Sequence, residues 1–205
     1  MTLDEILTQV DATASLMMGR TQRGWSRLDV TADGFLNSFY AIPVCFPAFL
    51  VTWLSHAAWI AQGGGTRSVG YIVIALGVLE LLGWASMIAL FFVLANAMRW
   101  RDRFVPVVVG VNWALVVVAY MQAVPATMAL VMGLGEGIAF ISLIVIVVTL
   151  VAFARVLNAT MERPIPVVGG VFLATVALSL LVTSWGHALF GIFDAAEPLS
   201  DLPQA

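Results

Sequence analysis

Charged side chains are scarce in this chain of 205 residues. Only 10% of the residues are charged, whereas 61% are hydrophobic and the mean hydropathy is +1.01. Soluble domains carry about 25% charged residues, because their surface faces water. A chain with so little polar surface cannot coat a water-soluble globule, so we expect its solvent to be the lipid bilayer.

Side chains that bind metals or attack substrates are also few. Cys45 is the only cysteine, which excludes an intrachain disulfide and a multi-cysteine metal site. The two histidines, His56 and His187, stand in no HxxxH or HExxH spacing. There is no nucleophile elbow and no phosphate-binding loop followed by lysine. We therefore expect no catalytic residue, no metal and no cofactor, and we predict that the protein is not an enzyme.

Lysine is absent, so all nine basic residues are arginines. No basic stripe is interleaved with aromatic residues, which argues against nucleic acid as a partner. Arginine in place of lysine, together with abundant alanine, valine and glycine, is typical of a GC-rich bacterial genome. We therefore expect a bacterial protein.

Five apolar segments predict the fold class, which is all-α. Each is near or above the ~20 residues that cross a bilayer as a helix. The prediction is a polytopic bundle of five transmembrane helices over residues 35–190, in which Pro43 and Pro47 kink the first helix. The predicted spans are about residues 35–60, 71–98, 104–132, 138–154 and 165–190.

The arginines predict the orientation of these spans. Eight of them precede the first span or lie in the connections around 99–103 and 155–163, and only Arg67 falls on the other side. Cytoplasmic loops retain Lys and Arg, so the N-terminus is predicted to be cytoplasmic. Residues 191–205 then form an acidic tail on the external or periplasmic side of the bacterial cytoplasmic (inner) membrane.

Residues 1–27 are predicted to form a cytoplasmic amphipathic helix and a basic anchor. Thr2 and Glu5 have the spacing of a capping box, and apolar residues from Leu3 to Met17 follow one helical face. Three arginines and Trp25 follow, as in segments that bind an anionic membrane surface. We expect this helix to lie in the membrane interface. The alternative is a cytoplasmic helix packed on the inner loops.

Two segments resemble each other at an offset of 60 residues. Residues 103–111 and 163–171 share an arginine, a proline, two valines, a glycine and a final valine. Each begins a predicted span, so the second and third spans resemble the fourth and fifth as two hairpins of the same orientation. Proline also suits the first turn of any helix, because its missing N–H has no partner there. True duplication and a shared start signal therefore both explain the match.

Glu80 is the one acidic residue well inside a predicted span. Ionisable groups at such depth are costly and are functional candidates. Glu80 should lie in the outer half of the membrane, where a small polar cluster could relay a proton or bind a cation. The alternative is a carboxyl group that is hydrogen-bonded between helices. The residues of the candidate cluster are Glu80, His56, Tyr120, Gln122 and His187.

A second candidate site is a basic surface on the cytoplasmic side. It fits anionic membrane lipids or a membrane-protein partner, which includes a second copy of the chain, although the topology signal alone also explains it. Its residues are Arg20, Arg23, Arg27, Arg99, Arg101, Arg103 and Arg163.

The plan of the chain resembles the Yip family. The resemblance covers the five spans of residues 35–190 and the charged turn of residues 99–103, whereas residues 28–35 differ from the acidic-Tyr-Gly-Pro segment of many eukaryotic members. It implies a non-enzymatic scaffold, membrane-organising protein or accessory subunit. The alternative is a small transporter or channel-like permease that uses Glu80. The position of Glu80 discriminates them: a cavity shared with His56, Tyr120 or His187 favours transport, and a solid bundle favours the scaffold.

Overall fold

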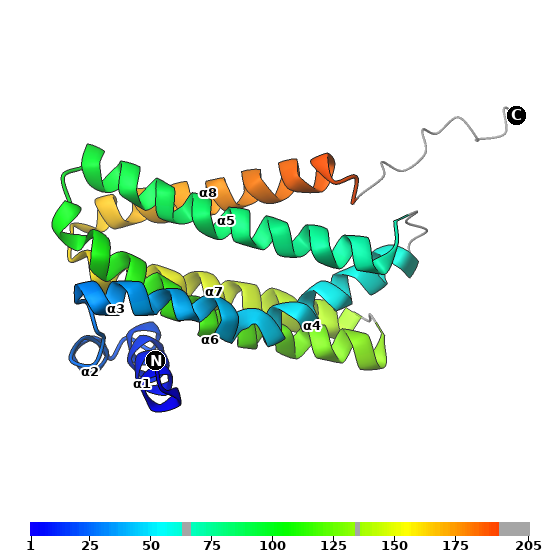
Figure 1. Ribbon diagram of the computed structural model, residues 1–205, viewed down its shortest axis with the longest axis horizontal. Helices are drawn as coiled ribbons and strands as arrows, with labels where there is room; N and C mark the ends of the chain where they lie inside the picture. The colour runs from blue at the N-terminus through cyan, green and yellow to red at the C-terminus, as the bar shows by residue number, and fades with distance from the viewer. Residues whose placement is uncertain (63–66, 134–135, 193–205) are drawn as a thin grey trace, which may run out of the picture.

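The computed structural model describes residues 1–62, 67–133 and 136–192, and these residues contain helices and no strands. Most of the predicted tail, residues 193–205, lies outside the described residues. The predicted all-α fold is confirmed, with five helices that are long and apolar enough to cross a membrane (Figure 1). The α-helices are α1 (Leu3–Met17), α2 (Thr21–Trp25), α3 (Ala32–Asn37), α4 (Ala41–Gln62), α5 (Val69–Ala97), α6 (Phe104–Met132), α7 (Glu136–Met161) and α8 (Ile165–Leu189).

The apolar helices agree closely with the predicted spans, apart from the fourth. The candidate spans are Ala32–Gln62, Val69–Ala97, Arg101–Met132, Gly137–Met161 and Ile165–Leu189. Helix α7 continues about two turns past residue 154, because Val156, Leu157 and Met161 are fully buried against the rest of the bundle. Arg155 therefore lies within a helix, although the sequence placed it in a connection.

The first span is bent, as its prolines predict. A 3-10 turn, η1 (Ser38–Tyr40), separates α3 from α4, and Pro43 removes the N–H that would bond to the Phe39 carbonyl. Pro47 lies inside α4 and leaves a second gap in the helix ladder. Figure 1 shows α3 and α4 as one bent rod.

Helix α6 forms the centre of the molecule. It packs along α4 on one side and α7 on the other, and 61% of its most apolar window is buried. Gly110 permits the close approach to α7, because a Cβ atom at this position would lie 2.7 Å from the Thr160 methyl group. Helices α5 and α8 pack against each other as a second layer (Figure 1).

The packing has an approximate twofold pattern. Helix α6 packs along α7, and α5 packs along α8. If α5 is equated with α7 and α6 with α8, the contact between α6 and α7 corresponds to the contact between α8 and α5. The two segments that resemble each other in sequence, residues 103–111 and 163–171, begin α6 and α8 and so occupy equivalent places. This arrangement supports an internal duplication.

Helix α1 lies across the spans near their arginine-rich end. Thr2 and Glu5 form the predicted capping box, with the Thr2 N–H donating to Glu5 at 2.7 Å. The buried face of α1 packs on α6 and α7, while Leu3 and Leu7 stay exposed. Figure 1 views α1 almost along its axis, at right angles to the bundle. Packing on the bundle is the predicted alternative, and the crosswise orientation also suits a helix at the membrane surface.

A cleft around Glu80

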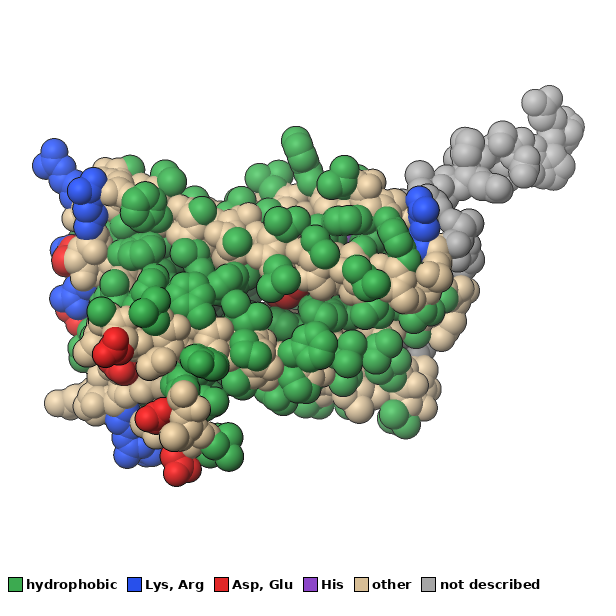
Figure 2. Space-filling model, in the orientation of Figure 1, with side chains coloured by type: hydrophobic (Ala, Val, Ile, Leu, Met, Phe, Trp, Pro, Cys, Tyr) green, Lys and Arg blue, Asp and Glu red, His purple; other side chains and the backbone are tan. Residues whose placement is uncertain are grey.

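Glu80 lies about 17 Å along α5 from its first residue, well away from either helix end. The side chain is half-buried and lines a cleft of about 460 Å³ between α4, α5, α6 and α8. No hydrogen bond or ion pair joins it to another residue in the part of the chain that the structure describes. Figure 2 shows acidic colour in a gap between hydrophobic side chains, halfway along the bundle.

Four of the five residues predicted for the polar cluster meet in this cleft. Glu80 from α5, His56 from α4, Gln122 from α6 and His187 from α8 all line it. The cleft extends from the middle of the bundle toward the end where Arg67 lies, because Trp59, Leu76 and His187 also line it.

Tyr120 does not line the cleft. Its side chain is 48% exposed, and its hydroxyl donates to the Val44 carbonyl at 3.2 Å. Val44 lies three residues before Pro47, where the proline disturbs the backbone ladder of α4. The Tyr120 hydroxyl thus forms a hydrogen bond with a backbone carbonyl next to the bend in α4.

Aromatic side chains form much of the wall beside Glu80. Trp53, Trp59 and Trp84 line the cleft. The Trp53 ring stacks on Phe49 with centroids 5.8 Å apart, and its edge lies against Gly77 of α5. Indole rings offer a negatively polarised face, which attracts cations.

A chain of buried hydrogen bonds begins at Trp84, which lines the cleft. The Trp84 indole N–H donates to the Asn112 Oδ1 atom at 3.0 Å, and the Asn112 amide donates to the Ser38 hydroxyl at 2.9 Å. Ser38 in turn donates to the Phe35 carbonyl at 2.7 Å. Asn112 is 1% exposed, so this chain satisfies its amide inside the protein.

Sequence reasoning missed the aromatic wall. Trp53 and Trp59 lie toward the end of the first predicted span, where tryptophan is common for its position at a membrane boundary. Trp84 lies in a helix with little amphipathicity. The spacing of Leu76, Glu80, Gly83, Trp84 and Met87 at three and four residues is the available signal, because these residues share one helical face and all line the cleft.

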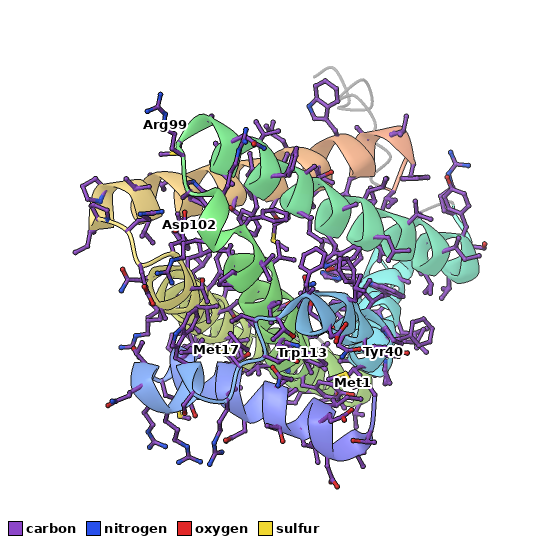
Figure 3. All side chains as sticks on the ribbon, turned by 60° about the vertical axis from the view of Figure 1, so that its left-hand side comes forward. Met1, Met17, Tyr40, Arg99, Asp102 and Trp113 are labelled. Carbon is purple, nitrogen blue, oxygen red and sulfur yellow. The ribbon has the colours of Figure 1, made fainter. Side chains whose placement is uncertain are left out.

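Most of the arginines predicted for lipid or partner contact are paired with acids. Arg23 and Arg27 both contact Asp11, at 3.5 and 2.6 Å. Arg103 pairs with Glu162 at 2.5 Å, and Arg163 pairs with Asp102 at 2.6 Å. Figure 3 labels Arg99 and Asp102 at the α5–α6 turn, and Figure 2 shows basic side chains gathered at this end. Arg20, Arg99 and Arg101 are exposed.

Neither a metal-binding group among the described residues nor a similar protein helps to identify the ligand of the cleft. Among the described residues, no three His, Cys, Asp or Glu side chains are grouped so that they could hold a metal ion. No protein-family model matches the chain, and no curated protein or solved structure is significantly similar to it.

Proposed function

We propose that this protein is a small, non-enzymatic membrane transporter that binds an organic cation at Glu80. The observation that supports it most is the position of Glu80, in a cleft between four helices that His56 and His187 also line. This is the arrangement that favours transport over a scaffold. An acid that served only to join helices would be hydrogen-bonded to a neighbouring helix.

The shape of the cleft supports an organic ligand. Its volume of about 460 Å³ lies within the ~300–1,000 Å³ of small-molecule sites and far exceeds that of an inorganic ion. A carboxylate in a cleft lined by indole side chains suits a cation that carries apolar groups, because Coulomb attraction and cation–π attraction can then act together. Removal from water into a half-buried site strengthens both terms.

The proposal predicts the effect of removing the Glu80 charge. Glu80→Gln keeps the shape of the side chain and should abolish saturable uptake of radiolabelled tetraphenylphosphonium into proteoliposomes. Tyr120→Phe is the matched control, because Tyr120 lies outside the cleft, and it should leave uptake unchanged. Equal uptake by the wild-type and Glu80→Gln proteins would contradict the proposal.

The scaffold or accessory subunit is the second proposal. The observation that favours it is an apolar stripe along α7, formed by Phe140, Ile144, Val147 and Val151, which are all about half exposed or more. Their spacing of four, three and four residues matches the seam of a helix pair. The uptake experiment separates the two proposals, because a scaffold does not depend on Glu80.

A further inference from the structure

Arg155 lies at a crevice that the cation proposal does not involve. It belongs to α7, about 9 Å along the axis from the end of that helix. One guanidinium nitrogen, Nη1, donates to the Met17 carbonyl at the end of α1 at 3.1 Å. Within the described residues, no acid pairs with Arg155, in contrast to Arg27, Arg103 and Arg163 at the same end of the bundle.

The crevice beside Arg155 has a polar part and an apolar part. Its volume is about 490 Å³, and it lies between the end of α1, α7 and α8. Arg155, Asn158 and Thr21 supply the polar groups. The apolar lining consists of Leu16, Val151, Ile165, Val168 and Phe172. Met17, next to the crevice, is labelled at the end of α1 in Figure 3.

We propose that this crevice binds one anionic phospholipid of the leaflet at the arginine-rich end. The guanidinium has five N–H donors in a planar fork, and one bond to Met17 leaves donors that fit a phosphate group. The apolar lining continues along α7 and α8 and accommodates an acyl chain. A free phosphate ion would use only the polar part.

The location of the crevice agrees with this occupant. Arg155 lies in the last two turns of a spanning helix, where arginine side chains extend toward lipid head groups. Helix α1 crosses the bundle at the same level and forms one wall. A bound lipid would therefore hold the crosswise helix against the spans.

Two neighbouring glycines permit a matched test of the acyl-chain part. Gly169 lines the crevice, whereas Gly170 does not. A Cβ atom at either position would meet no atom within 4 Å, so both accept a side chain. Gly169→Leu fills the apolar part and leaves Arg155 in place, and Gly170→Leu is its control.

The experiment is native mass spectrometry of the full-length protein after delipidation in mild detergent. With added phosphatidylglycerol, the wild-type protein should hold one lipid, and phosphatidylcholine should bind more weakly. Arg155→Gln and Gly169→Leu should each weaken the phosphatidylglycerol adduct by about tenfold or more. Gly170→Leu should leave it unchanged.

Two results would overturn the proposal. Retention of the adduct by Arg155→Gln would exclude the guanidinium as the head-group ligand. Loss in Arg155→Gln with full retention in Gly169→Leu would exclude the acyl-chain slot and leave a site for phosphate alone. Because Gly169→Leu preserves the bond between Arg155 and Met17, the test does not depend on the folding of Arg155→Gln.

Discussion

Asn112 is the residue that connects three helical segments beside the cleft. Its oxygen accepts from Trp84 of α5, and its amide donates to Ser38 before α4. A buried polar group that loses its partner costs about 1–3 kcal/mol, because lipid and apolar side chains supply no replacement. The position of Trp84, and with it one wall of the cleft, thus depends on Asn112.

Replacement of Asn112 should therefore destabilise the protein. We expect Asn112→Ala to lower the free energy of unfolding by about 2 kcal/mol, because it leaves the Trp84 N–H unpaired and opens a small cavity. Cys45 is fully buried, so its reaction with a thiol-specific fluorescent dye on heating measures unfolding.

Asn96→Ala is the control for this prediction. The Asn96 side chain donates to the Phe92 carbonyl within its own helix. Its loss should change the stability by no more than about 0.5 kcal/mol. If Asn112→Ala unfolded at the same temperature as Asn96→Ala, the hydrogen bonds of Asn112 would not contribute measurably to stability.

At the scale of elements, the turns of the two hairpins are joined by reciprocal ion pairs. Asp102-Arg103 and Glu162-Arg163 hold equivalent positions, and each arginine pairs with the acid of the other hairpin. Both turns also contain a non-glycine residue with positive φ, Arg99 at 57° and Glu162 at 47°. The reciprocal pairs join the two hairpins at this end.

A double-mutant cycle should detect one of these pairs. Asp102→Asn and Arg163→Gln, singly and together, should give a coupling energy of about 0.5–1 kcal/mol at low salt, because both side chains are partly exposed. The dye assay on Cys45 again provides the unfolding temperatures. Strictly additive effects would show that the pair contributes nothing.

The elements were predictable from the sequence, whereas their lateral arrangement was not. Long apolar runs and the Thr2–Glu5 spacing report on single helices, so five spans and the start of α1 could be located. The chain offers no comparable signal for neighbours: α5 and α6 have little amphipathicity, so hydropathy does not indicate the face that meets another helix. For this reason Glu80, His56, Gln122 and His187 could be proposed as a cluster, whereas the sequence did not indicate that Tyr120, proposed with them, lies outside the lining of the cleft.

At the scale of the whole molecule, the two ends of the described chain lie at opposite ends of the helical bundle (Figure 1). Helix α1 lies at one end of the bundle and the end of α8 at the other (Figure 1). The positive-inside rule adds the prediction that the end with α1 is cytoplasmic. The lipid crevice would then face the inner leaflet, and the cation cleft the opposite half of the membrane.

Cysteine labelling tests this orientation. Cys45 is the only cysteine, so Cys45→Ala gives a background without thiols. In intact cells, a membrane-impermeant maleimide should label Arg67→Cys in this background and should label Arg99→Cys only after the membrane is opened. Labelling of Arg99→Cys in intact cells would contradict the predicted orientation and indicate the opposite one.

The central claim, that Glu80 and the aromatic cleft bind an organic cation, is tested most directly by equilibrium dialysis of the purified protein with radiolabelled tetraphenylphosphonium. We predict one saturable site per chain in the wild-type and Tyr120→Phe proteins. Glu80→Gln should weaken the affinity by at least about tenfold, since it removes the charge beside the indole rings. Equal affinity in the wild-type and Glu80→Gln proteins, or no saturable binding in either, would contradict the account.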